Sequence, residues 1–137
     1  MTPSWFAIDH RFGPRKTQVI LQGLGVMEYI DRIASRVGVE PPWWGIMIRP
    51  MTGSEIRTGR KRCKGHGFWE VKTKTLALNK SMPARAIRLN LYHEMFHVAL
   101  PMLSDEEING AYLPELLAMM GDRMRKSDWK YMGTRRP

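Results

Sequence analysis

Apolar residues recur at helical spacing in three parts of the chain. In residues 18–37 they follow a period of three to four residues, which predicts a helix. Residues 84–100 form a second such stretch, and Pro101 ends it because proline cannot continue a helix. Residues 104–124 form a third, in which Pro114 predicts a kink.

Three short segments between the first two helices have the pattern of strands. Residues 43–51 alternate between two faces, and residues 67–71 and 75–79 are apolar or aromatic runs bounded by turn residues. This order of elements predicts an α+β fold. We expect a small, mostly antiparallel sheet that packs on an N-terminal helix, a central helix and a C-terminal helix.

The length and composition of the chain suit a single domain. It has 137 residues, of which 43% are hydrophobic, as in globular proteins. Residues 1–16 carry Pro3, Gly13 and Pro14 without any period, so we predict an irregular N-terminal arm. The domain should then cover residues 17–126, followed by a mobile basic tail at 127–137.

The formal net charge of +9 makes a polyanion a possible partner of the protein. Lysines and arginines cluster at 57–64, at Lys72 and Lys74, and at 123–136. Such a surface attracts nucleic acid through a salt-dependent term. A solvated surface with no specific partner explains the charge equally well, because no nucleic-acid-binding motif accompanies it.

Several features bear on the compartment. Cys63 is the only cysteine, which excludes an internal disulfide and favours a reducing environment. No apolar run approaches the roughly 20 residues that cross a bilayer. The first residues lack the basic start and apolar run of a signal peptide. We therefore expect a cytoplasmic protein without a membrane partner.

The sequence His93-Glu-Met-Phe-His97 carries the clearest chemistry in the chain. Residues four apart on a helix lie on the same face, so His93 and His97 can direct their imidazoles at one metal ion. Glu94 would flank the open coordination position and act as general base on zinc-bound water. The pattern therefore predicts a zinc site.

Catalytic zinc usually has three protein ligands, so a third must come from elsewhere. The helix after Pro101 should run back antiparallel and bring its first turns level with His97. Glu106 lies in that window, on the helical face that continues through the apolar residues toward Met124. We favour it as the third ligand, with Glu107 and Glu115 as alternatives. Glu107 is also expected to accept from the backbone in a capping box with Ser104.

Other candidates carry weaker signals. Cys63 and His66 form half of a zinc-ligand pair, but the chain has no second half. His66 or Tyr112 could stabilise an oxyanion in the metal site, although for Tyr112 a place in the core is the more common one.

With these residues in hand, the stretch from about Gly65 to Met124 resembles the core of the minimal zincin metallopeptidases. It is similar in particular to the SprT-like and ImmA/IrrE-like families of bacteria and their phages. The matching pieces are a glycine-led strand pair, the helix bearing His93-Glu-Met-Phe-His97, and the acidic helix start Asp105-Glu-Glu-Ile. The resemblance implies a compact zincin fold and zinc-dependent hydrolysis of peptide bonds.

In such families an edge strand before the motif helix binds extended peptide by β-augmentation. That role would fall here to Leu76, Ala77, Leu78 and Asn79. The alternative from another class is a non-catalytic, basic, zinc-containing module of phage or mobile-element type that binds nucleic acid or protein. Glu94 separates the two, because a structural zinc site has no need of it.

Overall fold

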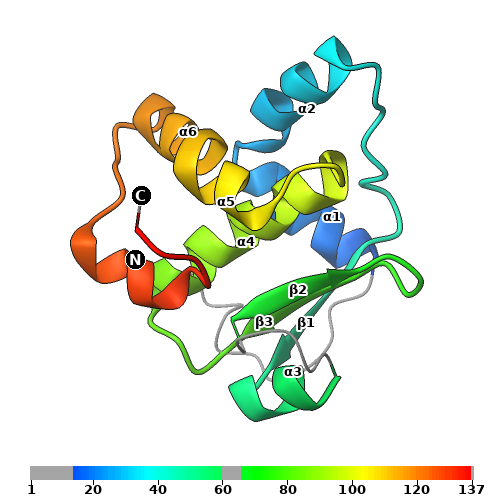
Figure 1. Ribbon diagram of the computed structural model, residues 1–137. Coiled ribbons are helices and arrows are strands. Elements are labelled where there is room, and N and C mark those ends of the chain that lie inside the picture. Colours follow the sequence, from blue (N-terminus) through cyan, green and yellow to red (C-terminus); the bar gives the residue numbers. More distant parts are fainter. Residues whose placement is uncertain (1–13, 60–65, 137) are drawn as a thin grey trace.

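The computed structural model describes residues 14–59 and 66–136, which form a three-stranded sheet with helices on both faces (Figure 1). The strands are β1 (Met47–Met51), β2 (Gly67–Glu70) and β3 (Thr75–Asn79), in the order β1-β3-β2. The expected α+β class is confirmed. The sheet is mixed rather than mostly antiparallel, because β3 pairs parallel with β1 and antiparallel with β2.

The central helix α4 (Ala84–Ala99) covers one face of this sheet (Figure 1). Leu76 and Leu78 point into the main core beneath it, and Ala77 points to the opposite face. There it packs with Ile56 of α3 (Gly53–Gly59), a short helix that is not among the predicted elements. Strand β3 is therefore buried on both faces, which explains why its three middle residues, 76–78, are all apolar.

The predicted helix at 18–37 is two helices, α1 (Pro14–Gly23) and α2 (Met27–Arg36). Gly25 lies between them with φ of +74°, a left-handed conformation that glycine adopts without strain. Residues 14–16 of the predicted arm belong to α1, and residues 1–13 lie outside the described part of the chain.

The chain after α4 forms a succession of short helical pieces. They are α5 (Asp105–Glu107), a π-helix (Ile108–Tyr112), α6 (Leu113–Met119) and a 3₁₀-helix (Lys126–Tyr131). The last piece packs against α4, and Met132 beyond it is 4% exposed. The described part of the predicted tail thus packs on the domain.

Arg85 of α4 attaches this C-terminal segment to the core. Its guanidinium donates to both carboxylate oxygens of Asp128 at 3.0 Å and to Asp122 at 2.8 Å. Asp128 is buried, and a buried carboxylate that loses its cationic partner destabilises the fold. The hydrogen bond from Arg85 also holds the pKa of Asp122 below its usual value.

None of the helices in residues 14–59 and 66–136 has the length and apolar character needed to cross a membrane.

Replacing Arg85 by methionine should lower the free energy of unfolding by about 3 kcal/mol, because the buried Asp128 would lose its cationic partner and keep only the backbone N–H of Arg125. Arg88→Met is the matched control, since Arg88 lies 3.6 Å from Asp122 and is more exposed. It should cost at most about 1 kcal/mol. Urea denaturation measures both, and equal losses in the two variants would contradict the role given to Arg85.

Candidate metal centre

Helix α4 brings His93 and His97 together as their spacing predicts. One helical turn separates them, and the two rings lie edge to face with centroids 4.8 Å apart. His93 is buried, whereas His97 is half-buried at the rim of the site. His93 is therefore the inner histidine of the pair and His97 the outer one.

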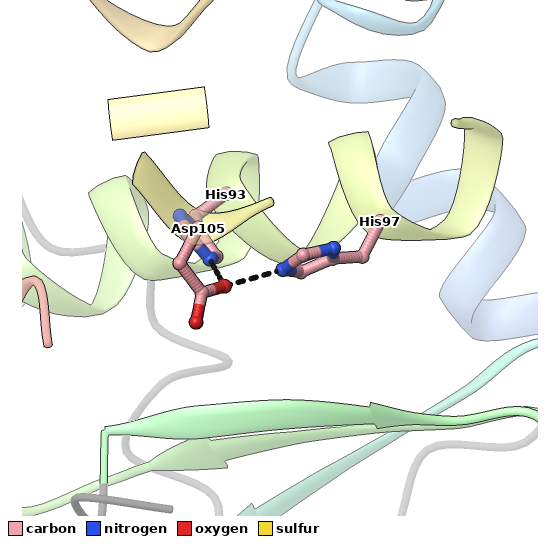
Figure 2. A group of neighbouring side chains, drawn as sticks. All are labelled: His93, His97 and Asp105. Carbon is pink, nitrogen blue, oxygen red and sulfur yellow. Dashed lines mark hydrogen bonds and ion pairs between the residues drawn. The ribbon is translucent and has the colours of Figure 1, made fainter. Parts of the chain in front are cut away.

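Asp105 completes the group from the first turn of α5 (Figure 2). Its Oδ1 lies 2.9 Å from Nε2 of His93 and 2.7 Å from Nε2 of His97. The possible ligand atoms of the three residues all lie within 4.8 Å of one another. Two imidazole nitrogens and a carboxylate oxygen thus converge on one point and can hold a metal ion.

The π-helix explains why this residue is Asp105. The N–H of Leu113 donates to the carbonyl of Ile108, five residues back, so this turn contains one residue more than an α-helical turn. Counting back from the buried Leu113 through the buried Ile108 gives Asp105 on the same face. An unbroken α-helix would have placed Glu106 there, which is the assumption behind the sequence prediction.

The three glutamates considered from sequence lie elsewhere. Glu106, the preferred third ligand, is not part of the group, and the carboxylate in it comes from the neighbouring Asp105. Glu107 accepts from the backbone N–H of Ser104, and the predicted capping box is confirmed. Glu115 lies beside Tyr29, whose pKa is raised by burial and by this carboxylate.

Asn109, in the π-helix, fixes the orientation of His93. Its Oδ1 lies 2.7 Å from Nδ1 of His93. Its amide nitrogen donates to the carbonyl of Met132 at 3.1 Å and to the hydroxyl of Thr134 at 2.9 Å. A carbonyl can only accept, so the amide nitrogen must face Met132 and the oxygen must face His93. In neutral His93 the proton therefore lies on Nδ1, and the Nε2 lone pair points to Asp105.

The electrostatics of the site favour positive charge. Burial lowers the pKa of His93, but hydrogen bonding to Asp105 and the nearby Glu94 carboxylate raise it, and the net shift is upward. Hydrogen bonds from His93 and His97 hold the pKa of Asp105 well below its usual range. An environment that stabilises a proton on His93 also stabilises a cation among the three residues.

A cavity of about 470 Å³ opens beside the group, between α4 and β2. His93, Glu94, His97 and Asp105 line one side, and Phe68 and Trp69 of β2 are among the residues that line the other. Glu94 is buried, and its Oε2 lies 4.0 Å from Nε2 of His93. The only acidic side chain on α4 thus reaches the same space as the converging ligand atoms.

The strand expected to bind peptide does not have a free edge. Leu76, Ala77, Leu78 and Asn79 belong to the central strand β3, which is paired with β1 on one side and β2 on the other. An extended peptide cannot add to a strand whose two edges are already hydrogen-bonded. The prediction that these four residues form a peptide-binding edge strand is therefore wrong, and it is β2 that faces the cavity.

The two candidates for stabilising an oxyanion, His66 and Tyr112, lie in different surroundings. His66 lines the cavity, and its Nδ1 lies 2.8 Å from the carbonyl of Tyr131. Tyr112 packs on Phe96 with ring centroids 5.8 Å apart, which is the core position expected for it. Cys63 lies outside the described residues.

Sequence reasoning missed Asp105 and Asn109. The available signal was Pro114: it cannot donate a backbone hydrogen bond to Gly110, so a regular α-helix was not to be expected through residues 105–114. That signal indicates an irregular turn, but not how far it shifts the helical face.

Compared with protein-family models, curated proteins and solved structures, the chain gives no match. The functional assignment therefore depends on the geometry of His93, His97, Asp105 and Glu94.

Proposed function

We propose that the protein is a zinc-dependent metallopeptidase with His93, His97 and Asp105 as the zinc ligands. The observation that carries the proposal is the convergence of their three ligand atoms in a cavity that also contains Glu94. Two histidines and a carboxylate form a three-ligand set of the kind that catalytic zinc uses, which leaves a position for water.

The residues present fit zinc better than they fit magnesium or calcium. Those hard cations prefer sites made of oxygen atoms, whereas imidazole nitrogens suit zinc and other transition metals. The hydrogen bond between Asn109 and His93 is also typical of metal-binding histidines, because it fixes the ring and its tautomer. When bound, zinc supplies a Lewis acid that polarises a carbonyl and lowers the pKa of water toward neutrality.

Glu94 is the residue that would move protons. It would accept a proton from water as the oxygen attacks a peptide carbonyl, and then pass that proton to the leaving amine. Its position on α4, directly after His93, holds the carboxylate at the cavity wall. His93 and His97 must be neutral to act as ligands, so a metal has to displace the extra proton that the raised pKa of His93 favours.

Replacing Asp105 by alanine should weaken zinc binding by at least about 100-fold. This exceeds the 10- to 100-fold loss typical when a residue that only orients a ligand is removed. Glu106→Ala, at the neighbouring exposed position, should change the affinity by less than about threefold, well below that range. Competition with a chromogenic chelator measures both affinities. A larger loss in Glu106→Ala than in Asp105→Ala would contradict the assignment.

Replacing Glu94 by glutamine should abolish cleavage while leaving zinc in place. The zinc-loaded wild type should cut members of a mixed library of unfolded peptides, followed by mass spectrometry. Glu94→Gln should reduce the rate by about 100-fold or more, as expected for loss of a general base. Glu106→Gln is the control for the same chemical change outside the site. Stoichiometric zinc without cleavage by the wild type would contradict a peptidase.

A second candidate function, nucleic-acid binding by the same chain, has its own supporting observation. Residues 123–136 carry six lysines and arginines, all exposed, namely Arg123, Arg125, Lys126, Lys130, Arg135 and Arg136. Asp128 is the one carboxylate in this segment, and it is buried against Arg85. The positive charge is therefore not neutralised within the segment, and an ordered basic surface attracts a polyanion.

Changing Lys126, Lys130, Arg135 and Arg136 to glutamine should weaken binding to a double-stranded DNA oligonucleotide. The slope of log affinity against log salt should fall by about one for each cation that contacts a phosphate. The control removes the same charge elsewhere, by changing the exposed Arg15, Arg32, Arg36 and Arg49 to glutamine. Fluorescence anisotropy over a range of salt measures both, and equal losses would show that only net charge matters.

A further inference from the structure

The C-terminal turn, residues 131–134, lies against the candidate metal centre rather than away from it. Three side chains from other elements bond to this turn through its polar atoms. His66 and Asn90 both bond the carbonyl of Tyr131, at 2.8 and 3.0 Å. Asn109 bonds the carbonyl of Met132 and the hydroxyl of Thr134.

Of these three side chains, Asn109 is the one that is also hydrogen-bonded to a proposed metal ligand, His93. Asn109 is 1% exposed and uses both amide protons on the C-terminal turn, so its oxygen has a single direction left, toward Nδ1 of His93. Asn90 instead divides its amide protons between Tyr131 and the carbonyl of Ala86 in its own helix. The two buried asparagines thus hold the same turn, but of the two it is Asn109 that is hydrogen-bonded to His93.

We infer that the C-terminal turn is part of the metal centre, because through Asn109 it sets His93 in the tautomer whose Nε2 can bind metal. The inference rests on the proposed zinc site. It makes Asn109 a positioning residue, and it means that residues near 132 influence a ligand almost 40 positions earlier in the chain. Without Met132 and Thr134 as acceptors, the Asn109 amide could rotate and offer a donor to His93, which favours the other tautomer.

The test compares Asn109→Ala with Asn90→Ala in the full chain. Asn109→Ala should lower zinc affinity by about 10- to 100-fold, the range for loss of a residue that orients a ligand. Asn90→Ala removes a buried asparagine that holds the same turn, and it should reduce stability to urea comparably while changing zinc affinity by less than about threefold, below that range. Equal losses of affinity in the two variants, or none in Asn109→Ala, would overturn the inference.

A second measurement does not require metal. In Asp105→Ala the Nε2 of His93 loses its carboxylate neighbour while the contact with Asn109 remains. Ring ¹⁵N chemical shifts of neutral His93 in this variant should show the proton on Nδ1 and the lone pair on Nε2. Adding Asn109→Ala should remove this preference. A proton on Nε2 in Asp105→Ala alone would contradict the inference, whereas absence of zinc binding by the wild type would contradict only the proposed zinc site.

Discussion

The contact of Asp105 with both histidines is the interaction on which the rest of the site depends. A single carboxylate oxygen lies within hydrogen-bonding distance of two imidazole nitrogens, one from each of two successive turns of α4. Asn109 requires the His93 proton to lie on the far side of the ring when that ring is neutral. Lone pairs of His93 and Asp105 then face each other, an arrangement that is stable only with a proton or a cation between them.

Two unusual features of the chain produce this contact. The π-helix adds a residue to the turn after α5, so that Asp105 and Asn109 both face α4 while Leu113 remains in the core. Arg85 then holds the C-terminal segment against α4 through the buried Asp128, which places the Met132 carbonyl beside Asn109. The segment that carries the exposed basic residues is thus also the one that supports the candidate metal centre. If nucleic acid binds there, it would bind next to the cavity.

The features that the sequence predicted correctly depend on interactions between residues close together in the chain. The motif helix, the pairing of His93 with His97 and the capping box at Ser104 follow from spacing and neighbouring side chains, and the structure agrees with all three. The third member of the group could not be derived, because its position depends on the hydrogen-bond register of one π-turn. The pairing of β3 on both edges and the docking of the C-terminal turn depend on contacts between distant residues, which periodicity does not report.

The most direct test of the account is the position of the metal itself. Anomalous diffraction at the zinc edge, from crystals of the zinc-loaded protein, should give one strong peak bonded to Nε2 of His93, Nε2 of His97 and the Asp105 carboxylate. Glu94 should lie beside the peak without being a ligand, and Nδ1 of His93 should remain bonded to Asn109. A peak bonded to Glu106 or Glu115 in place of Asp105, or no peak at these histidines, would contradict the account.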